Sequence, residues 1–209
     1  MLTKAVGGGL SALVATTGVV AAVYFGSSAE TLNVQPASNV YSLSEASKVL
    51  DDNLSDAQLQ KDKELQEIED SYELPSGGTF ESEYSFPEIN EQRSQVAAQM
   101  TERSSEESDF QTQEVWYESG YFKSDALVQW QCAWLKEAVL AQEAAESDRF
   151  DEAIARLRGF KDRKEISMFP DYDVFLAENV APLEKGDAAA SRAFLNSGYS
   201  CVEQNQIGN

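Results

Sequence analysis

The hydrophobic positions divide the chain into one unbroken apolar run and several amphipathic stretches after it. Following a single early cation, Lys4, residues 5–26 contain no charged side chain. A helix rises about 1.5 Å per residue, so this run would measure roughly 33 Å, enough to cross a hydrocarbon core of about 30 Å. We therefore predict an N-terminal hydrophobic helix that places the rest of the chain outside the cytoplasm.

Two interpretations of this helix stay open: a signal-anchor that spans the membrane and a signal peptide that is removed. Tyr24 and Phe25 close the run with an aromatic pair typical of the membrane interface, and Lys4 predicts a cytoplasmic N-terminus. The small residues 27–29 would instead suit a signal peptidase. We favour a single-pass protein of the cell membrane with its C-terminal part outside the cytoplasm. Secretion after cleavage near Ala29 is the alternative.

Residues 42–73 show the periodicity of one long amphipathic helix, and residues 42–45 have the form of a capping box. The apolar positions fall within about 100° of the helical wheel, and Lys61 and Glu64 interrupt them. We call this row of side chains the apolar stripe: Leu43, Leu50, Leu54, Leu65, Ile68 and Tyr72. A stripe this narrow predicts an interaction face for one partner, either the C-terminal domain or a second copy of the chain. A marginal helix in a disordered spacer is the alternative.

Two shorter stretches follow this helix. Residues 79–86 alternate between aromatic and polar side chains, which predicts at most a short strand or an extended docking segment. Residues 87–103 have helical spacing, which predicts a second helix.

Residues 120–209 carry the broadest apolar faces, which predict a small helical bundle. A long helix is expected over residues 125–146, and its apolar arc of about 200° predicts contact with at least two other helices. Ser147–Ile154 resembles the inter-helix turn of a tetratricopeptide repeat; no second copy follows, so we predict an ordinary helical hairpin. Further helices are expected over residues 169–180 and 188–195. The predicted fold class is all-α, with an N-terminal hydrophobic helix, an acidic and partly helical spacer, and a small C-terminal bundle.

Acidic residues are concentrated between the N-terminal run and the bundle. Residues 27–119 carry 21 acidic and 5 basic side chains, a net charge of −16, whereas residues 120–209 carry 15 and 10, a net of −5. We therefore predict a leader at 1–29, an acidic spacer at 30–119 and a helical domain at 120–209. The formal net charge of −20 argues against nucleic acid as a partner. The membrane, through the N-terminal helix, and a protein are the expected partners.

The chain has two cysteines, Cys132 and Cys201, both in the predicted helical domain. Because an exported domain folds in an oxidising compartment, we predict a disulfide between them. Two buried free thiols are the alternative.

The side chains offer little catalytic or metal-binding chemistry. The chain has no histidine, which removes the commonest general base and most zinc sites. We predict no catalytic residue, no metal site and no cofactor. Four carboxylates could still serve acid–base catalysis: Glu137, Glu143, Asp171 and Asp173.

These features favour a binding or scaffolding protein over an enzyme, with the apolar stripe as its expected partner-facing element. Two alternatives remain. The first is an exported carboxylate-dependent hydrolase of wall polysaccharide, and the second is an accessory subunit of a membrane complex, in which the N-terminal helix packs against neighbours.

Overall fold

The computed structural model describes residues 39–102, 109–197 and Cys201, which are mostly helical with one small two-stranded sheet. The mostly helical prediction is confirmed, whereas the sheet was not predicted. Residues 5–26, for which a membrane span or a signal peptide is predicted, lie outside this range. Among the residues described, no helix is both long and apolar enough to cross a membrane.

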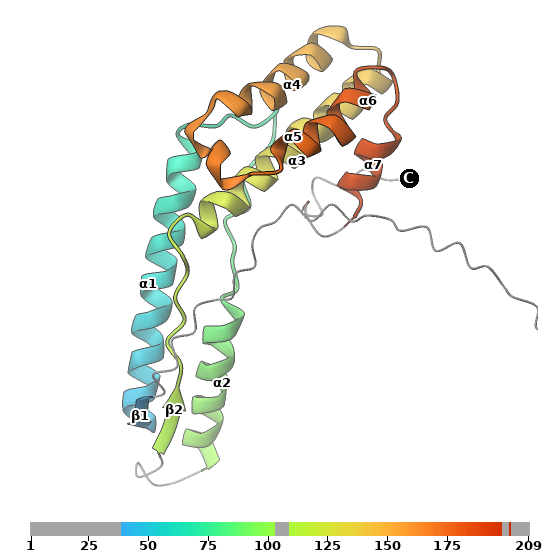
Figure 1. Cartoon of the computed structure of the whole chain (residues 1–209). Helices are drawn as coiled ribbons and strands as arrows, with labels where there is room; N and C mark the ends of the chain where they lie inside the picture. The colour runs from blue at the N-terminus through green and yellow to red at the C-terminus, as the bar shows by residue number, and fades with distance from the viewer. Residues whose placement is uncertain (1–38, 103–108, 198–200, 202–209) are drawn as a thin grey trace, which may run out of the picture.

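The longest element is α1 (Leu43–Glu69), which runs along the narrow half of the molecule (Figure 1). Its 27 residues measure about 40 Å. The predicted capping box starts the helix: the Ser42 Oγ accepts a hydrogen bond from the Glu45 amide (3.4 Å), and the Glu45 carboxylate accepts one from the Ser42 amide (3.2 Å). Both bonds satisfy amides that would otherwise lack a partner at the helix start.

Alongside α1 lies α2 (Pro87–Glu102), the predicted second helix, and near their far end β1 (Asn39–Ser42) pairs antiparallel with β2 (Asp109–Thr112) (Figure 1). We call these four elements, with the chain up to residue 119, the arm. A small core fills the space between them: Leu43, Ala46, Leu50, Val96 and Phe110. Residues 79–86 form no strand and run as an irregular connection into α2.

The remaining helices form the head, which begins with α3 (Tyr121–Glu143) and α4 (Ser147–Gly159). These two helices pack along each other as the predicted hairpin, although α3 starts at Tyr121 rather than at Asp125. The chain then turns back through short elements: η1 (Phe160–Asp162), η2 (Lys164–Met168), α5 (Tyr172–Phe175), the π-helical η3 (Leu176–Val180), α6 (Ala181–Leu183) and α7 (Ala189–Leu195).

One hydrophobic core joins the head to the near end of the arm. The broad face of α3 buries Trp130, Trp134 and Leu135, and α1 contributes Leu65 and Ile68 to the same cluster. Residue 120, where the sequence predicts a domain boundary, therefore lies next to a core that both sides share.

The predicted disulfide is present, with the two sulfur atoms 2.06 Å apart. Cys132 lies on α3 and is fully buried, and Cys201 is 4% exposed. Because the two residues are 69 positions apart, the bond ties the end of the described chain back to the central helix.

Candidate binding surface and its supports

A stretch without regular structure, residues 113–120, connects β2 to α3, and we call it the bridge segment. Side-chain amides from both arm helices bind its backbone in place of a strand. Asn53 of α1 donates to the Val115 carbonyl (3.0 Å) and accepts from the Val115 amide (3.0 Å). Gln92 of α2 makes the same pair of bonds with Gln113 (2.8 and 2.7 Å). The bridge segment is therefore fixed to two helices.

Side chains of the bridge segment alternate between the core and solvent. Val115 and Tyr117 are buried, whereas Trp116 between them is 54% exposed. Gln60 holds the next turn of chain by donating to the carbonyls of Tyr117 (3.3 Å) and Glu118 (3.1 Å). Trp116 is thus an exposed aromatic side chain on a fixed backbone.

Asn53 supplies a first test of these supports. Replacing Asn53 with Ala leaves the buried amide and carbonyl of Val115 without partners. We expect the free energy of unfolding to fall by about 2 to 3 kcal/mol, because an unsatisfied buried polar group costs about 1 to 3 kcal/mol. Urea unfolding measures the change. Ser55→Ala, an exposed substitution on the same helix, should change it by less than about 0.5 kcal/mol. Equal effects of the two substitutions would contradict this role of Asn53.

The interruption of the apolar stripe at Glu64 has a structural role that the sequence did not reveal. Glu64 is 5% exposed, and its carboxylate accepts hydrogen bonds from the amides of Gly120 (2.9 Å), Phe122 (3.0 Å) and Lys123 (3.3 Å). These amides belong to the N-cap Gly120 and to the first turn of α3, where the helix dipole favours a negative charge. A charged residue inside an apolar stripe was the available signal for this cap.

The apolar stripe itself is covered by the chain. Leu43 and Leu50 pack with α2 and β2, and Leu54 is partly buried against the cluster around Ile89. The C-terminal members, Leu65, Ile68 and Tyr72, pack in the shared core with the head. The structure thus buries the predicted interaction face inside the molecule, because α2, β2 and the head supply the apolar surface that the stripe needs.

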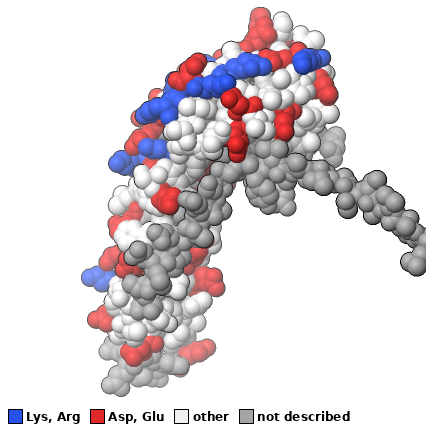
Figure 2. Space-filling model, viewed as in Figure 1, with Lys and Arg blue, Asp and Glu red and all other residues white. Residues whose placement is uncertain are grey.

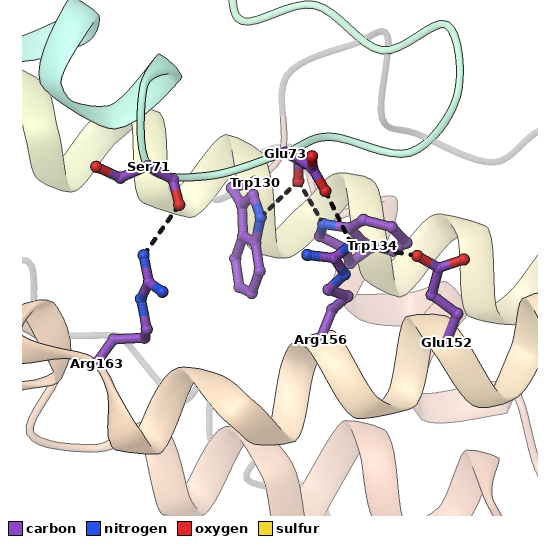
Figure 3. A network of polar contacts seen from close by, with 7 residues as sticks. All are labelled: Ser71, Glu73, Trp130, Trp134, Glu152, Arg156 and Arg163. Carbon is purple, nitrogen blue, oxygen red and sulfur yellow. Dashed lines mark hydrogen bonds and ion pairs between the residues drawn. The ribbon is translucent and has the colours of Figure 1, made fainter.

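The chain just after α1, residues 71–73, accepts hydrogen bonds from donors of the head (Figure 3). The indole nitrogens of Trp130 and Trp134 both donate to the Glu73 carbonyl, each at 2.9 Å. The Arg156 guanidinium binds the Glu73 carboxylate (2.9 Å), and Arg163 donates to the Ser71 carbonyl (2.9 Å). We call this network the clasp. It joins the arm to the head through polar contacts above the shared core.

Tyr72 lies between the two gripped carbonyls and is held from both sides. Its hydroxyl donates to the Glu165 carboxylate (2.6 Å), and the Arg163 guanidinium lies 4.6 Å from the centre of its ring. Burial, followed by the hydrogen bond to Glu165, raises the pKa of Tyr72 to about 12. Burial of Glu165 would raise the pKa of that carboxyl, but the Tyr72 hydroxyl, its own amide and Lys164 together lower it. The pair therefore favours a neutral phenol and a carboxylate.

This pKa predicts a loss of stability at high pH. Tyrosine in an unfolded chain has a pKa of about 10, so the folded state holds the Tyr72 proton more tightly. The contribution is complete below pH of about 10 and is lost as the pH rises towards about 12. Urea unfolding at increasing pH should therefore show the difference in stability between wild type and Tyr72→Phe shrinking across this interval. A constant difference would contradict the prediction.

The four carboxylates considered for catalysis do not converge. Glu137 pairs with Arg149 (2.7 Å), Glu143 pairs with Arg192, and Asp173 pairs with Lys161 (2.6 Å). Asp171 is exposed just before α5. The shallow groove of about 730 Å³ between α1 and residues 81–86 is lined by none of them. Within the described ranges, no cluster of three or more acidic or cysteine side chains is placed to hold a metal ion.

Cations on the visible face gather over the head at α4, whereas the charged side chains visible on the arm are mostly acidic (Figure 2). Those between residues 149 and 164 are already engaged. Five pair with carboxylates: Arg149, Arg156, Arg158, Lys161 and Lys164. Arg163, the sixth, belongs to the clasp. This row is therefore charge-compensated within the chain.

Comparisons with family models, with curated proteins and with solved structures gave no match to this chain. Its function is therefore inferred from its own sequence and geometry.

Proposed function

We propose that the chain is an extracytoplasmic binding or scaffolding protein, held at the outer face of a membrane by its N-terminal helix. The observation that carries the proposal is the disulfide between Cys132 and Cys201. Both sulfurs are buried in the head core. Structural disulfides of this kind persist in oxidising compartments and are rare in the cytosol. The uncharged run of residues 5–26 gives a route to such a compartment.

Binding is favoured over hydrolysis by the arrangement of the carboxylates and of the arm. Glu137, Glu143 and Asp173 each pair with a neighbouring cation, and Glu137 shares Arg149 with Glu146, so these carboxylates are engaged in ion pairs within the head. A glycoside hydrolase instead uses two carboxyl groups facing each other across a substrate, roughly 5 to 10 Å apart. The arm projects from the head (Figure 1), and the clasp fixes its end. Such a projecting, fixed element suits presentation of a surface to another molecule.

The location is tested by denaturing the producing cells in the presence of a thiol-alkylating reagent, which also reaches buried thiols, and then measuring the mass of the purified protein. Protection of both cysteines until reduction is the expected result. Two alkylated cysteines without reduction would overturn the extracytoplasmic location. The same mass shows where the mature chain starts. A mass that corresponds to a chain beginning near Glu30 would overturn anchoring and leave secretion.

A wall-degradation assay tests the activity class. Wild-type protein is expected to release no soluble polysaccharide. Release that is lost on Glu137→Gln or Glu143→Gln, and kept in the exposed variant Glu178→Gln, would overturn the binding proposal in favour of hydrolysis.

A further inference from the structure

We propose that the arm carries a docking face for a basic, arginine-containing segment of a partner protein. This inference rests on the proposed binding function and names the surface and the chemistry of the partner. The face combines the outward side of the bridge segment with the adjoining flank of α1. We call it the acidic–aromatic face: Asp52, Asp56, Leu59, Glu114, Trp116 and Glu118.

Trp116 is the centre of this face. The chain has three tryptophans, and Trp130 and Trp134 are each only 4% exposed. Trp116 is 54% exposed, although the backbone on both sides of it is fixed by Asn53 and Gln60. An exposed tryptophan on a fixed backbone loses little conformational freedom on binding, and tryptophan is enriched among residues that dominate binding energy.

Acidic side chains flank Trp116 along the bridge segment. Glu114 and Glu118 stand two positions before and after it, on the side opposite the buried Val115 and Tyr117, because successive side chains of an extended chain alternate. A cation placed over the Trp116 ring would therefore meet a carboxylate on either side.

The flank of α1 extends the face. Asn53 and Gln60, seven residues apart, lie on one line of the helix and contact the bridge segment. Helical geometry places Asp52, Asp56 and Leu59 on the strip beside that line. All three are exposed, Leu59 at 64%. The strip adds two carboxylates and one apolar side chain next to the bridge segment.

Charge selects the partner. The described arm, residues 39–102 and 109–119, carries 18 acidic and 4 basic side chains, a net of −14. Complementary charge steers association, and an arginine guanidinium both pairs with carboxylates and stacks on an indole ring. A second copy of this chain is a poor occupant, because its α4 cations are already engaged and its net charge is −20.

The test uses fluorescein-labelled polyarginine and polylysine peptides of equal length, with anisotropy titrations against the full-length protein, purified with its disulfide formed. Polyarginine should bind more tightly than polylysine, and Trp116→Ala should weaken polyarginine binding at least about tenfold while removing that preference. The double variant Glu114→Gln, Glu118→Gln should weaken the binding of both peptides and reduce the dependence of that binding on salt concentration.

Matched controls lie on the head. Val174→Ala removes an exposed apolar side chain, and Asp151→Asn with Glu178→Gln removes the same charge as the double variant of the bridge segment. The controls should change binding less than about twofold. Unchanged urea unfolding of every variant establishes that a lost signal is not lost folding.

Two results would overturn the docking face. The first is that the head variants weaken peptide binding as much as the variants of the face do. The second is that Trp116→Ala binds each peptide with the same affinity as the wild type. A self-associated wild type that Trp116→Ala dissociates in sedimentation would also overturn it, by assigning the face to a second copy. None of these outcomes alters thiol protection in cells, so failure of the face is distinguishable from failure of the proposed location.

Discussion

Replacing both cysteines with alanine is expected to lower the free energy of unfolding by about 4 kcal/mol, the largest single effect we predict for this chain. Cys132 and Cys201 are 69 positions apart, so the bond removes much of the entropy of the unfolded chain between them. Both side chains are buried, and alanine leaves no polar atom in the core. The midpoint of thermal unfolding should fall by roughly 10 °C.

Chemical reduction provides the internal control for this prediction. A reducing agent should destabilise the wild type by a similar amount and leave the Cys132→Ala, Cys201→Ala variant unchanged. Stability that is equal in wild type and variant under non-reducing conditions would show that the bond constrains little of the unfolded chain. Urea unfolding with and without the reducing agent gives all four values.

Much of the helical framework was predictable because hydrophobic periodicity reports burial directly. The capping box at 42–45 starts α1, and the broad arc of α3 lies at the centre of the head. The disulfide was predictable because a domain exported into an oxidising compartment is expected to pair its two cysteines. In each case the signal is local in sequence or depends on residue type.

The elements that escaped prediction depend on contacts between distant residues. β1 and β2 have four residues each and pair Asn39 with Thr112 across a long connection, so neither has enough length for a recognisable alternation. The sequence of the bridge segment shows no apolar–polar alternation, because the exposed Trp116 is itself apolar and stands between the buried Val115 and Tyr117. Its backbone partners, Asn53 and Gln92, lie on distant helices. Sequence patterns along one element cannot report such partners.

Acid content was a misleading guide to order in residues 39–119. It favoured a solvated spacer, yet the described part of this stretch contains two packed helices and a paired sheet. The narrow apolar stripe accounts for the difference. Most acidic residues of α1 lie on its exposed side, where they remain solvated and cost little free energy of folding, while Leu50 and Ile68 are fully or almost fully buried. Net charge describes the surface of the arm, and the stripe determines its packing.

Glu64→Ala is the second large effect we predict, with an expected loss of about 3 kcal/mol in the free energy of unfolding. The substitution leaves the amides of Gly120 and Phe122 without acceptors at the start of α3 and removes the charge that the helix dipole favours there. Gly120 has a φ of 93° and no side chain, so it cannot cap the helix in place of Glu64.

Two further variants separate this cap from a general effect of charge on α1. Glu64→Gln keeps the shape and one acceptor oxygen, so it should cost about half as much as Glu64→Ala. Glu69→Ala removes an exposed carboxylate from the same helix and should stay within about 0.5 kcal/mol of wild type. Equal losses in the free energy of unfolding for Glu64→Ala and Glu69→Ala, measured by urea unfolding, would refute the role of Glu64 as a cap. The expected ranking would show that one buried carboxylate of the arm holds the first turn of the head's central helix.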